Sequence, residues 1–282
     1  MATPFDENGR VDEAAALKLA TYLLEHGSHG LVISGSTGEA PTLTDEEALD
    51  LTKAVRREVG EDVLLICGTG TNYTAHSIEL TQAAAEAGVD AALIVTPYYN
   101  KPNPAGIQAH FEAIAAAVPS LPLIAYNIPS RVVVNVPPEQ LAELAKIENV
   151  VAVKQANNEE LQPIEGLDIL AGNDDIFLKT LEIGGAGGIC VASHLIGPQM
   201  REVWDAAQAG DLDRAREIDA GLREVYAAMG VTTNPIPVKA ALEMTGLIPS
   251  GTLRLPLVPA DDGQRATVRT ALEGVGLTPV SS

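Results

Sequence analysis

The residue best placed to do chemistry in this sequence is Lys154, which follows the apolar run Val150–Val153. Four apolar residues, mostly β-branched, predict a strand buried on both faces, as in a parallel sheet. A lysine at the end of such a strand lies at the edge of the core, where loss of hydration disfavours the ammonium ion and lowers a lysine pKa. The neutral amine can then attack a carbonyl carbon. The alternative is a lysine that ends the strand and extends its charge into water.

Polar residues follow several other apolar strands in the same way. Because the carboxyl ends of parallel strands meet on one face of a barrel, these groups are expected to lie near Lys154. They form the segments Gly35–Glu39, Gly68–Gly70, Thr96–Asn100, Tyr126–Arg131, Gly172–Asp174 and Val191–Ser193. Hydroxyls, tyrosines, one arginine and one lysine would share this face, which favours a reactive lysine over a solvated one.

Three of these groups could bind an anion or move protons beside the amine. Backbone N–H groups and hydroxyls of Gly35–Glu39, between a strand and a helix, can bind a carboxylate or a phosphate, although a tight turn is the structural alternative. Tyr126 ends a strand, and a phenol near an amine can move protons during imine formation, although tyrosines also pack at barrel ends. Arg131 can hold a carboxylate with its guanidinium group or pair with surface acids.

Strands and amphipathic helices alternate along the first two thirds of the chain. The predicted strands are Gly30–Ser34, Val63–Cys67, Ala91–Val95, Leu123–Tyr126, Val150–Lys154, Asp168–Ala171 and Gly188–Val191. The predicted helices are Glu13–His26, Asp45–Val59, Thr74–Ala87, Ala105–Val118, Glu139–Ile147, Glu159–Glu165 and Asp174–Ile183. The second helix begins with a capping box formed by Thr44 and Glu47.

This repeat predicts an α/β fold, a (β/α)8 barrel with a C-terminal helical appendage. Only seven strands are evident, and Met1–Phe5 resembles the tail of a first strand whose beginning is missing. A seven-strand sheet or an open, doubly wound sheet is the alternative. After Val191 the pattern is helical only, over Gln199–Ala209, Leu212–Met229, Ile236–Glu243 and Gln264–Glu273. We therefore expect a barrel over residues 1–210 and a helical region over residues 211–282.

Composition excludes several classes of partner. The 282 residues carry a net charge of −20, and 18 lysines and arginines without a cluster argue against nucleic acid and anionic membranes. Cys67 and Cys190 lie in apolar runs, which predicts buried, reduced thiols and a cytoplasmic protein. The glycine-rich run Gly184–Gly188 follows a helix and precedes a strand, so we expect a tight turn and no nucleotide site. The five histidines lack metal-ligand spacing, and no metal is expected.

The motifs together resemble those of the dihydrodipicolinate synthase/N-acetylneuraminate lyase family of pyruvate-dependent class I aldolases. They are Gly-Ser-Thr-Gly-Glu at 35–39, Thr-Pro-Tyr-Tyr-Asn at 96–100, Tyr-Asn-Ile-Pro-Ser-Arg at 126–131 and Val-Lys at 153–154. Asn-Pro-Ile-Pro-Val-Lys at 234–239 and Leu-Arg-Leu-Pro at 253–256 continue the resemblance into the helical tail. Membership implies a barrel with a C-terminal helical domain, a homotetramer built as a dimer of dimers, and no cofactor.

The resemblance also implies roles for individual residues. Lys154 would form the Schiff base with pyruvate, and Tyr126 would be the proton shuttle above it. Ser36 and Tyr99 match the other members of the family's proton relay, and the tyrosine reaches across the tight-dimer interface.

The substrate contacts follow from the same resemblance. Thr37 matches the contact to the pyruvate carboxylate, and Ile189 supplies a backbone contact to that ligand. Arg131 resembles the residue of the synthase branch that binds the carboxylate of aspartate semialdehyde, and Gly172 is a further expected substrate-binding residue.

The choice of aldehyde depends on details in which the chain departs from the synthase pattern. Ser36 stands where threonine is commoner in synthases, Val132-Val133 replaces a common Thr-Gly, and Gln155-Ala156-Asn157 replaces a common Glu-Ala-Thr or Asp-Ala. These differences concern the acceptor pocket. The leading hypothesis is a synthase of lysine biosynthesis that condenses pyruvate with aspartate semialdehyde. The alternatives are a lyase acting on a 2-keto-3-deoxy sugar acid or sialic acid, and a catalytically silent barrel that senses a keto acid.

Feedback inhibition by lysine, found in part of the family, uses polar and histidine side chains at the tight interface. Here the matching positions are Ala40, Pro41, Asp45 and Ala48, with His76 where an acid would stand. We expect lysine inhibition to be weak or absent.

Overall fold

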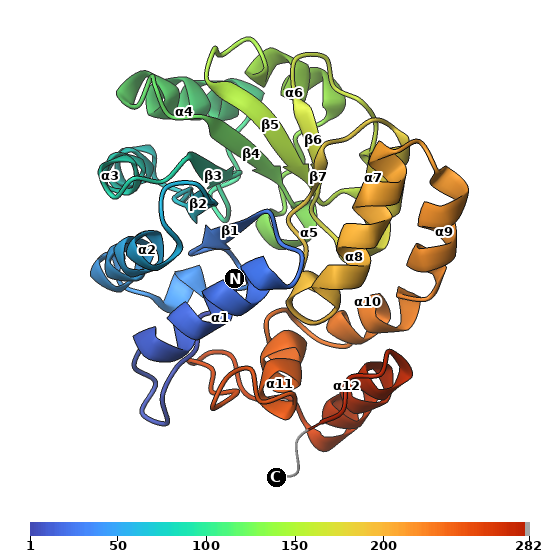
Figure 1. The fold of residues 1–282 in the computed structure, drawn as a ribbon. Helices are drawn as coiled ribbons and strands as arrows, with labels where there is room; N and C mark the ends of the chain where they lie inside the picture. Colours follow the sequence, from blue (N-terminus) through green and yellow to red (C-terminus); the bar gives the residue numbers. More distant parts are fainter. Residues whose placement is uncertain (280–282) are drawn as a thin grey trace. The chain divides into compact units, whose positions relative to one another are not determined.

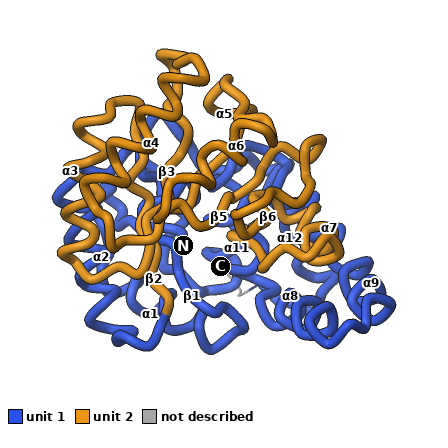
Figure 2. Tube along the Cα trace, turned by 90° about the horizontal axis from the view of Figure 1, so that it is seen from above, with its two compact units in different colours: residues 1–63, 191–282 blue, residues 64–190 orange. Residues whose placement is uncertain are grey.

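The computed structural model describes residues 1–279, and the chain divides into two units, shown in different colours in Figure 2. Unit 1 contains residues 1–63 and those from 191 on, and unit 2 contains residues 64–190. The expected boundary at residue 210 stays a prediction. None of the described helices is both long and apolar enough to cross a membrane.

Unit 2 is a parallel sheet whose strands pair in chain order, with helices outside the strands (Figure 1). Its strands are β2 Leu64–Gly68, β3 Ala91–Val95, β4 Leu123–Asn127, β5 Val150–Gln155, β6 Asp168–Ala171 and β7 Gly187–Gly188. Its helices are α3 Thr74–Glu86, α4 Pro104–Ala117, α5 Pro129–Val132, α6 Pro138–Leu144 and α7 Phe177–Glu182. Short 3-10 turns lie at Asn158–Glu160 and Asp174–Ile176. Residues 184–186 of the expected turn lie, as predicted, between α7 and β7, whereas Gly187 and Gly188 form β7 itself.

Strand β5, which carries Lys154, is buried except at Val151, which is 41% exposed. The register between β4 and β5 shifts here: Leu123 lies opposite Val150, whereas Ile124 lies opposite Ala152. The prediction of a strand buried on both faces is therefore wrong at Val151, because the irregularity leaves this residue without a partner on β4. Beyond it the strands stay in register to their carboxyl ends.

Unit 1 contains strand β1 and the helices of both chain ends. Helix α1 (Glu13–Glu25) packs on α2 (Asp45–Val59) and on β1 (Gly30–Ile33). In the tail, α8 packs on α9 and α12 packs on α10 and α11; their bounds are Ser193–Gln208 for α8, Leu212–Ala220 for α9, Arg223–Met229 for α10, Ile236–Met244 for α11 and Asp262–Gly274 for α12. The predicted capping box of Thr44 and Glu47 is confirmed, with both of its hydrogen bonds present.

The segment Met1–Phe5 lies beside β1 without forming a strand. The Met1 amino group donates to the Val32 carbonyl oxygen at 2.5 Å, and Thr3 Oγ1 donates to the Gly38 carbonyl oxygen at 2.7 Å. An isolated antiparallel bridge joins Phe5 to Val11. The expectation of a strand tail is corrected to a segment outside any strand, held by these hydrogen bonds and the bridge.

Three predicted helices differ from the structure. No α-helix forms over 159–165, because Pro163 disfavours helical geometry before it, and Leu161 is extended. The helix expected over 212–229 is broken into α9 and α10 near Gly221, a poor helix former. Helix α8 begins six residues before the predicted start at Gln199 and has a non-helical residue, Ile196, two positions before Pro198.

Candidate active site

Lys154 and Tyr126 are brought together at the carboxyl ends of β5 and β4. The two strands are parallel and the residues are partners in the ladder, so their side chains leave the sheet on the same face. Lys154 Nζ lies 4.3 Å from the centroid of the Tyr126 ring. Lys154 is 9% exposed and Tyr126 is 5% exposed. The alternative of a solvated lysine is therefore excluded, and the phenol is next to the amine, as proton transfer requires.

An acidic pair from the next two strands lies in the same region of unit 2. The thiol of Cys190 donates a hydrogen bond to the carboxylate of Asp174, a buried residue after β6. Loss of hydration raises the pKa of the Cys190 thiol far above its usual range, Asp174 raises it further, and the nearby Lys154 acts in the opposite direction. The thiol therefore stays protonated. Both cysteines are free; Cys67 is buried as predicted, whereas Cys190 keeps partial exposure.

Gly172 and Ile189 lie at the ends of β6 and β7. A side chain at position 172 would approach the Gln155 carbonyl oxygen to 2.8 Å, and the Gly172 N–H donates to that oxygen at 2.7 Å. Glycine is therefore required here for close packing on β5. The Ile189 N–H donates to the Ala171 carbonyl oxygen at 2.9 Å, so the carbonyl is the backbone group that Ile189 can offer to a ligand.

Tyr99 and Arg131 lie on the loops after β3 and β4, and both side chains are exposed. Tyr99 is 87% exposed and has a left-handed backbone, with φ of 73°. Arg131 belongs to the single-turn helix α5, whose first turn is closed by hydrogen bonds to the Ile128 carbonyl oxygen. Each residue is in the loop position that the sequence predicts.

Ser36 and Thr37 belong to unit 1, in the turn after β1. The turn is closed by the N–H groups of Gly38 and Ala40, which both donate to the Gly35 carbonyl oxygen. Within residues 1–279, no hydrogen bond uses the N–H of Ser36 or Thr37, so both donors are available to an anion. Thr37 Oγ1 accepts a hydrogen bond from Asn234 Nδ2 at 3.0 Å.

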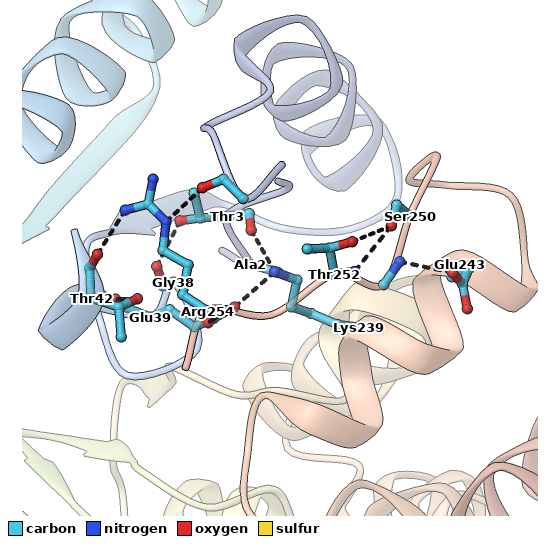
Figure 3. Close-up of polar contacts among 12 residues, drawn as sticks. Ala2, Thr3, Gly38, Glu39, Thr42, Lys239, Glu243, Ser250, Thr252 and Arg254 are labelled. Carbon is cyan, nitrogen blue, oxygen red and sulfur yellow. Dashed lines mark hydrogen bonds and ion pairs between the residues drawn. The ribbon is translucent and has the colours of Figure 1, made fainter. Parts of the chain in front are cut away.

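A buried ionic network holds the end of this turn (Figure 3). Glu39 and Lys239 are fully buried and form an ion pair of 2.7 Å, and Lys239 Nζ also donates to the Thr3 carbonyl oxygen at 2.9 Å. The second carboxylate oxygen of Glu39 accepts the backbone N–H of Arg254 at 3.1 Å. Burial lowers the pKa of Lys239, and the hydrogen bond that its ammonium group donates to Glu39 opposes this shift.

Arg254 extends the network to the first turn of α2. Its guanidinium group donates to both carboxylate oxygens of Glu47, at 2.6 and 2.7 Å, and to the carbonyl oxygens of Gly9 and Thr42. The Arg254 hydrogen bond lowers the pKa of Glu47 to about 2. Sequence reasoning cited the segments that contain Glu39, Lys239 and Arg254 as motifs but did not predict that these residues contact one another.

The described part of the chain holds no group of three or more His, Cys, Asp or Glu side chains arranged to bind a metal ion. Buried His194 has its Nε2 occupied by the Ala2 N–H at 3.0 Å and its Nδ1 2.8 Å from the Val191 carbonyl oxygen. Burial, with the nearby amino terminus, lowers its pKa to about 3. His194 is therefore a neutral structural residue.

A buried lysine next to a tyrosine at the carboxyl ends of parallel strands is the arrangement of a Schiff-base, or class I, lyase. The sequence profile of the dihydrodipicolinate synthetase family matches residues 1–275, and the chain belongs to this family. It is therefore an enzyme of the pyruvate-dependent class I aldolases.

Several relatives have the same name. The 4-hydroxy-tetrahydrodipicolinate synthase of a Cyanothece species is 45% identical over 285 residues, which cover 98% of this chain and 96% of the relative. That of Moorella thermoacetica is 43% identical over 285 residues, covering 98% and 97%.

Solved structures agree in fold. Dihydrodipicolinate synthase from Aquifex aeolicus has a TM-score of 0.94 at 35% identity, covering 100% of this chain and 98% of that one. The enzyme from Cyanidioschyzon merolae, solved with lysine bound, has a TM-score of 0.93 at 37% identity, covering 98% and 96%. The predicted fold class, a (β/α)8 barrel with a C-terminal helical appendage, is confirmed by this likeness.

Proposed function

We propose that this enzyme is a 4-hydroxy-tetrahydrodipicolinate synthase, which condenses pyruvate with L-aspartate-4-semialdehyde in lysine biosynthesis. The observation that carries the proposal is the pair of Lys154 and Tyr126, with Nζ 4.3 Å from the ring centroid, in a chain of this family. The synthase name of the relatives, at 43–45% identity over nearly the whole chain, supports the choice of the aldehyde.

The proposed mechanism begins at Lys154. Its neutral amine attacks the keto carbon of pyruvate, and loss of water gives an iminium ion. The iminium withdraws electrons from the methyl group, which loses a proton to form an enamine. The enamine carbon then attacks the aldehyde carbon of the semialdehyde, and the alkoxide that forms takes up a proton to become a hydroxyl. The amino group of the semialdehyde attacks the re-formed iminium carbon and displaces the Lys154 amine, which releases a cyclic product. Tyr126 is the group placed to carry protons to and from the amine during these steps. No step needs a cofactor.

The other assignments follow from the resemblance and are proposals of the same kind. Ser36 and Tyr99 belong to the proton relay with Tyr126. Thr37, in the turn with free N–H donors, binds the pyruvate carboxylate, and the Ile189 carbonyl and Gly172 line the ligand site of unit 2. Arg131 binds the carboxylate of the semialdehyde through its guanidinium group.

We further propose a cytoplasmic homotetramer, a dimer of dimers. The free thiols Cys67 and Cys190 suit a reducing compartment. Tyr99, 87% exposed in one chain, is available to reach a second copy. Sedimentation of the purified enzyme tests the assembly: a tetramer is expected, and a Tyr99→Ser variant should lower the turnover number.

The substrate is tested by offering the enzyme the alternatives in parallel. Pyruvate with aspartate semialdehyde should be consumed, whereas N-acetylneuraminate and 2-keto-3-deoxy sugar acids should not be cleaved. Arg131→Ala should raise KM for the semialdehyde strongly and leave pyruvate binding unchanged. Cleavage of a sugar acid without semialdehyde condensation would overturn the proposal in favour of a lyase.

Inhibition by lysine is expected to be weak or absent. Activity should therefore change little when lysine is added at low-millimolar concentration. A loss of more than half of the activity would contradict this expectation.

A further inference from the structure

The two residues that follow the reactive pair lie on the other face of the sheet. Asn127 and Gln155 come directly after Tyr126 and Lys154 and are partners in the same ladder. Side chains alternate along a strand, so these amides leave the sheet away from the amine. Both are buried, and Asn127 Nδ2 donates to Gln155 Oε1 at 3.1 Å. We call Asn127 and Gln155 the amide clamp.

The Asn127 side chain holds both polar backbone groups of Val136. Its Oδ1 accepts the Val136 N–H at 3.1 Å, and its Nδ2 donates to the Val136 carbonyl oxygen at 3.2 Å. The segment between these two residues contains α5 and therefore Arg131. One buried side chain thus closes residues 128–135, the loop that contains Arg131, which we call the arginine loop.

Gln155 connects this loop to the one after β5. Its Oε1 also accepts the Asn157 N–H at 2.9 Å. Asn135, at the end of the arginine loop, accepts from Asn127 Nδ2 at 3.0 Å and from Asn157 Nδ2 at 3.2 Å. It donates in turn to both carboxylate oxygens of Glu160, at 3.1 and 2.9 Å. Both loops therefore depend on the same amides.

The arginine loop needs such restraint because it contains a strained residue. Val133 has φ of 69° and is 65% exposed, although its side chain is β-branched. A left-handed conformation is strained for a residue of this kind, because its Cβ comes too close to the carbonyl oxygen that follows. Contacts elsewhere must hold the loop in this shape, and the amide clamp is the buried part of those contacts.

We propose that the amide clamp positions Arg131 and thereby determines the affinity for the aldehyde substrate, whereas imine formation depends on Lys154 on its strand. The inference rests on the proposed function. It also gives a role to one departure from the family pattern. Gln155 stands where glutamate is common, and its side chain lies on the face of the sheet opposite the Lys154 amine. Since Gln155 accepts both bonds with a single oxygen, a glutamate at this position retains its acceptors.

The test compares two glutamine substitutions with a matched control. Gln155→Leu removes both acceptors, Gln155→Glu keeps them, and Gln140→Leu changes another buried glutamine, which donates to the Pro104 carbonyl oxygen away from the arginine loop. KM for aspartate semialdehyde should rise about tenfold in Gln155→Leu and about threefold or less in the other two. The pyruvate concentration that gives half-maximal borohydride-trapped adduct should be unchanged in all three.

Unchanged KM for the semialdehyde in Gln155→Leu would overturn the inference, and so would an equal rise in the half-saturating pyruvate concentration. If Gln155→Leu does not fold, the Asn135→Ala variant is the test. KM for the semialdehyde should rise about threefold through loss of the hydrogen bonds that Asn135 makes, and no rise would contradict the proposed role. Failure of the wild-type enzyme to trap pyruvate would refute the proposed function instead, so the two failures are distinguishable.

Discussion

Two loops that carry proposed substrate contacts are held in opposite ways. The turn at 35–39 in unit 1 ends in a fully buried ion pair between Glu39 and Lys239. The arginine loop of unit 2 is closed by the uncharged amides of Asn127 and Gln155. Separating a buried ion pair leaves an uncompensated charge at a high cost in free energy, so the pair holds its turn in one position. Removing one partner of an amide hydrogen bond costs less free energy, so substitutions can change the loop proposed to bind the aldehyde without unfolding the protein.

Lys239→Met should have the largest effect. The variant keeps most of the side-chain volume but leaves the Glu39 carboxylate buried without its cation. We expect the free energy of unfolding to fall by ~3–5 kcal/mol, measured by denaturant titration. A loss below ~1 kcal/mol would show that the ion pair is less important than its burial indicates.

The double variant Glu39→Gln/Lys239→Met separates charge from packing. Because no charge is then left buried, most of the stability lost in Lys239→Met should return. The glutamine that replaces Glu39 in this variant can still accept the Arg254 N–H. A double variant no more stable than Lys239→Met would contradict this explanation, because the loss in Lys239→Met would then not come from the unpaired carboxylate.

Asn127→Leu should destabilise less than Lys239→Met. It leaves the buried N–H and carbonyl of Val136 without the bonds that Asn127 provides, at a cost of ~1–3 kcal/mol. Thermal unfolding of this variant beside Lys239→Met gives the comparison directly. A larger loss in Asn127→Leu would reverse the proposed difference between the two loops.

Val133→Gly should be mildly stabilising, because glycine adopts a left-handed backbone without strain. The gain is expected to be ~1 kcal/mol or less, since glycine also loses more freedom on folding. The midpoint of denaturation measures it. A clear loss of stability would mean that the exposed valine makes a contact that outweighs its strain.

Stability should also fall as the pH drops below neutrality, through buried histidines in both units. Burial lowers the pKa of His110 to about 4, whereas a histidine in the unfolded chain has a pKa near 6.5. Between these two pH values the unfolded chain therefore binds more protons than the folded protein. The free energy of unfolding is therefore not reduced by His110 above about pH 6.5, and it declines as the pH falls towards about 4. A His110→Gln variant should show a flatter decline between about pH 6.5 and 5. The stabilisation from Glu47 is complete above about pH 4.5 and is lost only as the pH falls from there towards its pKa of about 2.

The sequence predicted the strands and most helices because burial and periodicity are local signals. It also predicted Lys154 and Tyr126 at neighbouring strand ends, since parallel register follows from the βα repeat. The bond between Glu39 and Lys239 was not predictable in this way, because it joins residues 200 positions apart. The exposure of Val151 depends on a register shift against another strand, which no local pattern shows.

The side of the sheet on which Gln155 lies could have been read from alternation. It follows Lys154 directly, so the two must face opposite ways. The hydrogen-bond partners of Gln155 could not be predicted, because Asn127, Asn135 and Asn157 come from three segments that meet only in the fold.

The most direct test of the account is to incubate the enzyme with pyruvate and borohydride, read the intact mass and map the modified peptide. One reduced pyruvyl adduct per chain, on the peptide that contains Lys154 and absent from a Lys154→Arg variant, is the expected result. A folded protein without an adduct, or with its adduct on another lysine, would contradict the assignment of Lys154 as the Schiff-base residue.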